Sequence, residues 1–289
     1  MILGQLIFSG IINGAIYSLM AIGYVLIYKG TNVVNFAQGE AVMVGGYIAL
    51  IYITVVKLPM YLVIPLTFVS GMLFWIIVER IVYRSLQDSP VFSLIIATFA
   101  VGLSLRNLVR LIFGPEIYNF PPLMSIAPVK IFGIYSTLQN ISILFIGFVS
   151  TVILFLFFRY TKIGKAMRAI SQNRDAAWLM GIHVKRYFGL IWGLGSAYGA
   201  LGGLMLAPLV TLSPEMGWIA IKAFAVAILG GFESLHGAII AGLLLGVVEN
   251  LAGFYVSTHI KDVIAFLIIV GVLYIKPSGI FGEITIKRA

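Results

Sequence analysis

The stretch GKAMRAISQNRDAAWLMGI, residues 164–182, indicates the fold most directly, because it is a polar segment in the middle of an apolar chain. It holds four charged residues and no long apolar run. The chain of 289 residues is 61% hydrophobic and only 10% charged, whereas soluble domains are about 25% charged. The mean hydropathy of +1.08 does not fit a soluble protein. We therefore expect an all-α integral membrane protein in which this stretch connects membrane helices.

Apolar segments of about membrane-spanning length lie on both sides of that stretch, and a spanning helix needs roughly 20 such residues. The segments are approximately 5–28, 36–56, 60–79, 91–113, 138–158, 187–208, 216–233, 236–253 and 261–276. The second contains Gly45 and Gly46, the seventh contains Gly230 and Gly231, and the last three are short. The glycine pairs are places where a helix could break. The sequence predicts a polytopic helical bundle of eight or nine spans, with residues 1–289 forming a single transmembrane domain.

Basic residues are concentrated in alternate connections between these segments. With the N-terminus outside, the cytoplasmic side receives Lys29, Arg80, Arg84, seven basic residues of the loop 159–186, Lys276, Lys287 and Arg288. The outer side keeps Lys57, Lys130 and Lys261. Lys and Arg collect in cytoplasmic loops, so we predict an N-out/C-in orientation with 114–137 as the longest outer loop. This rule also explains the net charge of +9 without a nucleic-acid partner.

Glycine patterns suggest where helices touch and how the chain is built. Small residues one turn apart, at Gly10 and Gly14 and at Gly242 and Gly246, allow close backbone approach, although glycine is common in membrane helices. A third ridge follows residues 195–203. MVGGYIAL (43–50) resembles AILGGFESL (227–235), and the two would cross in opposite directions. The match is short, so an inverted repeat and a chance resemblance are both open.

Three polar residues stand at the start of the second segment, namely Asn35, Gln38 and Glu40. Polar side chains in a bilayer are retained where they face protein or water, which makes them functional candidates. We assign a candidate translocation pathway to them, together with the glycine pairs at 45–46 and 230–231. The alternative is an ordinary helix start, with Asn35 as N-cap and Glu40 in the first turns.

Two arginines, Arg106 and Arg110, share one helix face near the outer end of the fourth segment. They lie within snorkelling reach of the interface, so we expect membrane anchoring rather than substrate binding. Glu249 and Asn250 are the candidate partners for them. The pattern does not decide between these arrangements.

Enzymatic chemistry has little support in the sequence. There is no cysteine, the three histidines are widely spaced, and no metal-ligand cluster or cofactor motif occurs. Ser196 and His236 could imitate a protease dyad, but helical rise places Ser196 roughly 14 Å below the cytoplasmic edge where His236 lies. No phosphate-binding Walker A loop is present, so any ATP used must be bound by another chain.

The opening stretch has the local signals of two short helices. Residues 164–170 are compatible with the first, and Asn173 can cap the second, with Asp175 in its first turn and Gly181 at its end. Such a helix is too short to be stable alone in water, so it needs a surface. Ala176, Ala177 and Met180 would form a small face suited to a groove on a partner. A solvated basic loop is the alternative.

The same stretch resembles a known cytoplasmic loop. NRDAAWLMGI (173–182) looks like the coupling loop of LivH-type permeases, the membrane subunits of branched-chain amino acid ABC importers, with Asp175 in place of the consensus glutamate. The stretches 10–40 (ending in NFAQGE), 225–242 and 276–282 (KPSGIFG) resemble further motifs of that family. This chain departs from the family at Arg106 and Arg110, because the family's fourth span is expected to carry less charge. The resemblance implies an ATPase-coupling role for Gly164, Arg168, Asn173, Arg174, Asp175, Ala176, Ala177, Met180 and Gly181.

The resemblance also implies a function and partners. The chain would be a multi-pass subunit of the bacterial cell (inner) membrane that translocates leucine, isoleucine and valine, not itself an enzyme. It would pair with a LivM-type permease as a heterodimer, with two cytoplasmic ABC ATPases that hydrolyse ATP, and with an extracytoplasmic substrate-binding protein. Related permeases carry urea or short-chain amides, which is the alternative cargo. The alternatives of a different class are a membrane assembly subunit that transports nothing and an intramembrane protease.

Overall fold

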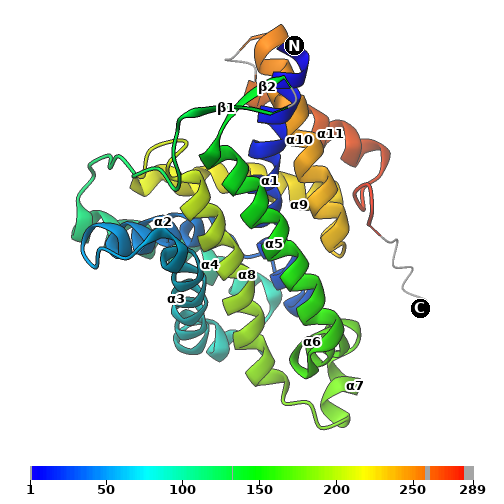
Figure 1. Ribbon diagram of the computed structural model, residues 1–289. Coiled ribbons are helices and arrows are strands. Elements are labelled where there is room, and N and C mark those ends of the chain that lie inside the picture. The colour runs from blue at the N-terminus through cyan, green and yellow to red at the C-terminus, as the bar shows by residue number, and fades with distance from the viewer. Residues whose placement is uncertain (1, 132, 258–260, 283–289) are drawn as a thin grey trace.

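The computed structural model describes residues 2–131, 133–257 and 261–282, and within them the chain is mostly helical, as predicted (Figure 1). The first half contains α1 (Ile2–Thr31), α2 (Gln38–Thr54), α3 (Met60–Ile81), η1 (Tyr83–Leu86), α4 (Val91–Phe113), β1 (Pro128–Ile131) and β2 (Ile134–Thr137). The second half contains α5 (Leu138–Tyr160), α6 (Lys162–Gln172), α7 (Arg174–Leu179), α8 (Val184–Leu206), η2 (Pro214–Ile219), α9 (Ala220–Gly230), α10 (Leu235–Tyr255) and α11 (Lys261–Ile275). The small antiparallel hairpin β1–β2 was not predicted.

Two helices form the centre of the bundle. Helix α8 packs between α3 and α1, and α1 packs between α8 and α10 (Figure 1). All but a few residues of α8 are buried. This burial is possible because α8 is rich in glycine and alanine, which let neighbouring backbones approach closely.

The predicted glycine contacts are confirmed. A Cβ atom built on Gly14 of α1 would lie 2.6 Å from the carbonyl oxygen of Gly242 in α10. One built on Gly195 of α8 would lie 2.8 Å from the carbonyl oxygen of Gly23 in α1. The small residues therefore mark real helix interfaces, because a larger side chain would collide with backbone.

Six of the described helices, α1, α3, α4, α5, α8 and α10, are long and apolar enough to cross a membrane. The apolar helices α2, α9 and α11 have 17, 11 and 15 residues. The predicted eight or nine spans are therefore not confirmed by helix length. The glycine pair expected to interrupt the seventh segment instead ends its helix: α9 stops at Gly230, Gly231 has φ 91°, and a turn leads to α10.

The break predicted at Gly45 and Gly46 is wrong. Helix α2 continues through both residues. Gly45 lies against the backbone of Ala200 in α8, and a Cβ atom on Gly46 would lie 2.6 Å from Leu212. These glycines serve close packing rather than an interruption of the helix.

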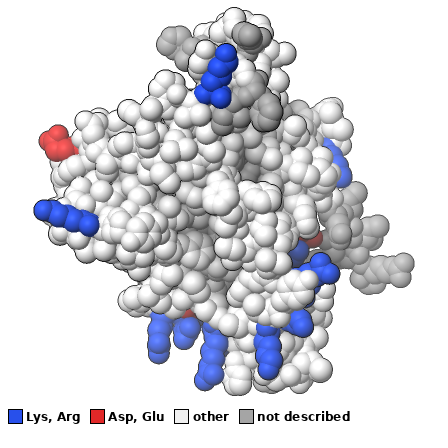
Figure 2. Space-filling model, viewed as in Figure 1, with Lys and Arg blue, Asp and Glu red and all other residues white. Residues whose placement is uncertain are grey.

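The basic side chains gather at one end of the molecule. Figure 2 shows most of the visible Lys and Arg at the end where Figure 1 places α6 and α7. Lys162, Lys165 and Arg168 of α6 are exposed there. This asymmetry is what the predicted orientation requires, although the direction of the chain across a membrane is still a prediction.

Candidate functional site

The polar residues at the start of α2 are buried and bonded to one another. Asn35 and Gln38 are fully buried, and Glu40 is 4% exposed. The Nδ2 of Asn35 donates to Oε1 of Gln38 at 3.2 Å, and Nε2 of Gln38 donates to the carbonyl oxygen of Gly195 in α8 at 3.0 Å. Asn35 and Gln38 therefore fix the start of α2 against the central helix.

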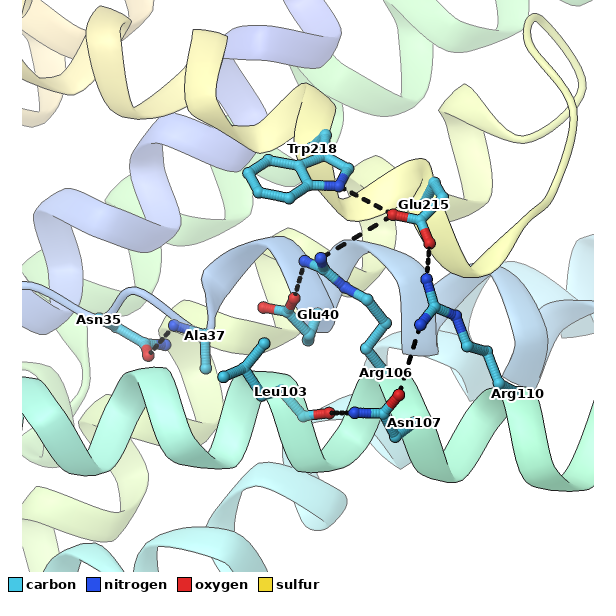
Figure 3. A network of polar contacts seen from close by, with 9 residues as sticks. All are labelled: Asn35, Ala37, Glu40, Leu103, Arg106, Asn107, Arg110, Glu215 and Trp218. Atoms are coloured by element: carbon cyan, nitrogen blue, oxygen red, sulfur yellow. Dashed lines mark hydrogen bonds and ion pairs between the residues drawn. The ribbon is translucent and has the colours of Figure 1, made fainter. Parts of the chain in front are cut away.

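The alternative interpretation of Asn35 as the N-cap of α2 is wrong in detail. The helix begins at Gln38, and the cap position is Ala37, which has no side-chain cap. Asn35 instead accepts from the backbone N–H of Ala37 at 3.0 Å, two residues ahead, as asparagine does in turns (Figure 3). The first-turn position of Glu40 is confirmed.

Glu40 forms a buried ion pair with an arginine of α4. Its Oε1 lies 2.5 Å from Nη2 of Arg106, and the two side chains are only 5% and 14% exposed. The expectation that Arg106 anchors the chain by snorkelling is therefore wrong. The negative carboxylate of Glu40 balances the positive guanidinium of Arg106 within the helix bundle, and a buried charge needs such a partner.

The network extends to η2 through Glu215, a residue that the sequence analysis did not single out. Oε2 of Glu215 lies 3.9 Å from Nη1 of Arg106 and accepts from the indole N–H of Trp218 at 2.8 Å, while Oε1 pairs with Arg110 (Figure 3). The guanidinium of Arg106 also stacks over the Trp218 ring, 4.7 Å from its centroid. The network thus ties α2, α4 and η2 together, and it becomes exposed at Arg110 and Glu215.

Glu249 and Asn250 do not pair with the arginines, so that expectation is wrong. Oε1 of Glu249 lies 2.5 Å from Nζ of Lys222 in α9, with the two side chains 1% and 19% exposed. Asn250 donates to the carbonyl oxygen of Leu6 at 2.7 Å. Both residues belong to the contact of α10 with α1 and α9, a different part of the bundle.

The candidate pathway residues do not form one group. Gly45 and Gly46 share α2 with Gln38 and Glu40 but pack against α8 and the loop after it. A Cβ atom on Gly231 would lie 2.7 Å from the backbone nitrogen of Gly282, and Ile280 donates to the carbonyl oxygen of Leu229 at 2.7 Å. The second glycine pair therefore serves the turn between α9 and α10 and its contact with residues 278–282.

The polar stretch quoted at the outset folds into α6 and α7. Thr161 caps α6 by accepting from the backbone N–H of Gly164 at 2.9 Å, and Gly164 itself is buried against Phe157 of α5. Asn173 caps α7 by accepting from the N–H of Ala176 at 2.9 Å, as predicted. Gly181 ends the turn with φ 82°, also as predicted. The exposed Asp175 stands in the first turn of α7.

The outward face of α7 differs from the predicted one. Ala177 is 4% exposed and packs in a cluster with Val184, Phe188 and Trp192, so its assignment to the outward face is wrong. Ala176 and Met180 are exposed as expected. The exposed knob, defined as Trp178, Leu179 and Met180, has exposed fractions of 67%, 76% and 83%.

Side-chain contacts connect this loop and the start of α8 to the membrane helices. Arg174 stacks over Phe188 of α8, 4.6 Å from the ring centroid. Glu79 at the end of α3 is fully buried and accepts from Arg84 at 3.1 Å and from Gln87 at 2.8 Å. Arg84 also reaches the carbonyl oxygen of Lys185 at 3.5 Å. Helix α7 thus contacts α8 through Arg174, and the start of α8 contacts the end of α3 through Arg84.

Known proteins are similar to this chain over nearly its full length. Residues 6–273 match the family described as "Branched-chain amino acid transport system / permease component". The high-affinity permease protein LivH of Salmonella typhimurium is 31% identical over 98% of this chain and 97% of its own length. BraD of Pseudomonas aeruginosa is 30% identical over 98% and 97%, and a probable LivH of Methanocaldococcus jannaschii is 32% identical over 94% and 92%. No solved structure matches this chain. By the family match and by these identities, the chain belongs to the branched-chain amino acid transport system permease family.

Proposed function

We propose that this chain is the membrane-spanning permease subunit of an ABC importer that moves leucine, isoleucine or valine across the bacterial cytoplasmic membrane. The observation that carries the proposal is the exposed apolar knob on a capped helix, joined to the bundle core by Ala177 and Arg174. An apolar knob on an otherwise basic surface is suited to a cleft on a partner protein. Family membership supports ATPase subunits as that partner, and they would supply the ATP hydrolysis.

The proposed orientation is N-out/C-in with nine crossings in one transmembrane domain. Nine segments would cross the membrane in alternating directions. They are the six long helices, α2, α11, and one segment of 17 residues formed by η2 and α9 together. Two contacts support this order. Lys29 at the end of α1 donates to the carbonyl oxygen of Glu233, which precedes α10, at 3.0 Å. At the other end of α1, Gln5 accepts from the backbone N–H of Tyr135 at 3.0 Å.

An inverted repeat fits the same arrangement, because α2 and α9 would then cross in opposite directions. Gly39 and Gly217 contact one another reciprocally, each with its Cβ position close to the other's carbonyl oxygen, at 2.5 and 2.9 Å. This contact places the start of α2 against η2, which precedes α9, and the resemblance of residues 43–50 to 227–235 supports the repeat.

Within this function, Glu40 and Arg106 would contribute to the translocation pathway, with Asn35 and Gln38 holding them in place. The network is buried at Glu40 and half-exposed at Glu215 and Arg110, so it offers a graded polar surface. A carboxylate and a guanidinium can exchange partners with the ammonium and carboxylate groups of an amino acid. Urea and short-chain amides carry no such pair of charges, so the network favours the amino-acid cargo.

The partners would be a LivM-type permease, two cytoplasmic ATPases and an extracytoplasmic binding protein. The test is uptake of radiolabelled leucine into vesicles containing the assembled complex, with ATP inside or absent. We expect ATP-dependent uptake that excess isoleucine and valine suppress and that urea and acetamide leave unchanged. Suppression by urea or acetamide alone would assign the other cargo, and no ATP-dependent uptake with any of them would leave an assembly role.

A further inference from the structure

A cavity of about 1130 Å³ opens at the end of the bundle that carries α6. It lies among α1, α5, α6, α8 and the turn before α10, apart from the Glu40 network and from the exposed knob of α7. Its basic lining residues are Lys29, Arg159 and Arg168, and its apolar ones include Leu26, Phe155 and Phe158. At this size it is comparable to the larger ligand sites of proteins, which reach about 1,000 Å³.

The charge of the lining is predominantly positive. The lining has three basic side chains and one acidic residue, Glu233. The ammonium of Lys29 donates a hydrogen bond to the backbone carbonyl oxygen of Glu233, not to its carboxylate. In the part of the chain that the structure describes, Lys29, Arg159 and Arg168 form no ion pair. The N-terminal turn of α10, with Ser234 as its cap, also lines the cavity and adds its positive dipole end. The lining residues therefore carry a net positive charge, with three basic side chains against the one carboxylate of Glu233.

The apolar residues of the cavity lie deeper in the bundle than its basic residues. Phe155 lies one turn before Arg159 on α5, and Leu26 lies one turn before Lys29 on α1, so an apolar residue lies inward of each of these two basic residues. The ring of Phe155 stacks on that of His236 at 4.6 Å and closes one wall. A rim of positive charge with an apolar interior matches a phosphate group attached to hydrocarbon chains. It does not match a small soluble anion alone.

We propose that this cavity binds an anionic phospholipid of the cytoplasmic leaflet. Its phosphate diester would lie against Lys29, Arg159 and Arg168, and the first part of its acyl chains against Phe155 and Phe158. Basic pockets between membrane helices on the cytoplasmic side are suited to such head groups. The bound lipid would join α1, α5, α6 and the α9–α10 turn, and would therefore steady the helix that carries the coupling loop. The inference uses the proposed orientation only to place the cavity in the cytoplasmic leaflet.

The test is lipid retention by the purified assembled complex in neutral detergent, measured by native mass spectrometry after adding phosphatidylglycerol or phosphatidylcholine. The variant Arg159→Gln/Arg168→Gln removes two charges from the cavity. The matched control, Lys162→Gln/Lys165→Gln, removes two exposed charges from α6 that do not line it. We expect phosphatidylglycerol retention to fall about tenfold in the first variant and less than about twofold in the control. An equal fall in both would overturn the proposal.

A second variant and a soluble probe cover the remaining outcomes. Ser171→Trp fills the cavity from α6 without changing its charge, and should also abolish selective retention, so retention at the unmodified level would contradict the proposal. Glycerophosphoglycerol, which has the head group without the chains, should not displace the lipid. Displacement by it would assign the site to a soluble phosphate ester, and displacement by inorganic phosphate would assign it to free phosphate; either result would overturn the lipid proposal. Because the measurement needs neither ATP nor transport, it stands or fails independently of the proposed function.

Discussion

Replacing Glu40 by glutamine tests whether the buried ion pair holds α2 to α4. The substitution removes the carboxylate that lies 2.5 Å from Arg106, whose side chain is only 14% exposed. Removing one partner of a buried pair costs about 3–5 kcal/mol, because the remaining charge loses its compensation. Arg106 would keep Glu215 at 3.9 Å and the Trp218 ring. We therefore expect a loss of unfolding free energy near the lower limit, about 3 kcal/mol.

The matched control is Glu215→Gln, which removes a carboxylate from the same network. Its side chain is 48% exposed, so solvent screens its interactions and we expect a loss below about 1 kcal/mol. The double variant Glu40→Gln/Arg106→Met removes both charges of the buried pair. It should recover most of the stability lost in the single variant, because no uncompensated charge is left.

Denaturant unfolding in mixed micelles measures these differences in the free energy of unfolding. The expected order of stability is Glu215→Gln above the double variant, with Glu40→Gln lowest. If Glu40→Gln unfolds within about 1 kcal/mol of the unmodified chain, the pair behaves like a surface salt bridge. The buried network would then contribute nothing to the position of α2.

Single cysteines at Ser125 and Ser171 should react with impermeant reagents from opposite sides of the membrane, Ser125 from outside. The chain has no native cysteine, so only the introduced one reacts. Labelling of both from the same side would overturn the orientation. Gly14→Ala places a Cβ atom 2.6 Å from a carbonyl oxygen of α10 and should destabilise the chain by about 1–3 kcal/mol, whereas Gly4→Ala, with its nearest atom at 3.6 Å, should be near neutral in the same unfolding assay. Gln38→Leu removes the hydrogen bond to α8 and should lower leucine uptake without reducing the amount of assembled complex; a proportional loss of complex would assign Gln38 to structure alone.

Local signals in the sequence were sufficient for the cap and the end of α7 and for the glycine contacts. The capping role of Asn173 and the helix end at Gly181 depend on residues within a few positions, so the spacing predicts them. The contact at Gly14 was predictable because in lipid few other features bring backbones together. The pair at Gly45 and Gly46 shows the limit. Glycine permits either a break or a close approach, and only the position of α8 decides which occurs.

Long-range pairing could not be read from the sequence. Arg106 meets a carboxylate 66 positions earlier and another more than 100 positions later, and no periodicity links them. The direction of Ala177 depends on where Phe188 and Trp192 pack, which the short helix does not encode by itself. The sequence did offer one signal for the exposed knob, the tryptophan that follows two alanines in α7. A helix this short can bury only one face, so burying the small Ala177 leaves Trp178 and Leu179 outside.

The most direct test of the coupling role is association with the ATPase subunits after changing the exposed knob. Trp178→Ala/Leu179→Ala removes two side chains that are 67% and 76% exposed, so the fold of the chain should be unaffected. The control Met124→Ala/Ile126→Ala removes exposed apolar side chains from the loop before β1, at the opposite end. We expect the first variant to lose ATPase subunits in a pull-down and to lose ATP-driven leucine uptake, and the control to retain ATPase binding. Full ATPase binding and full uptake by the first variant would contradict the account.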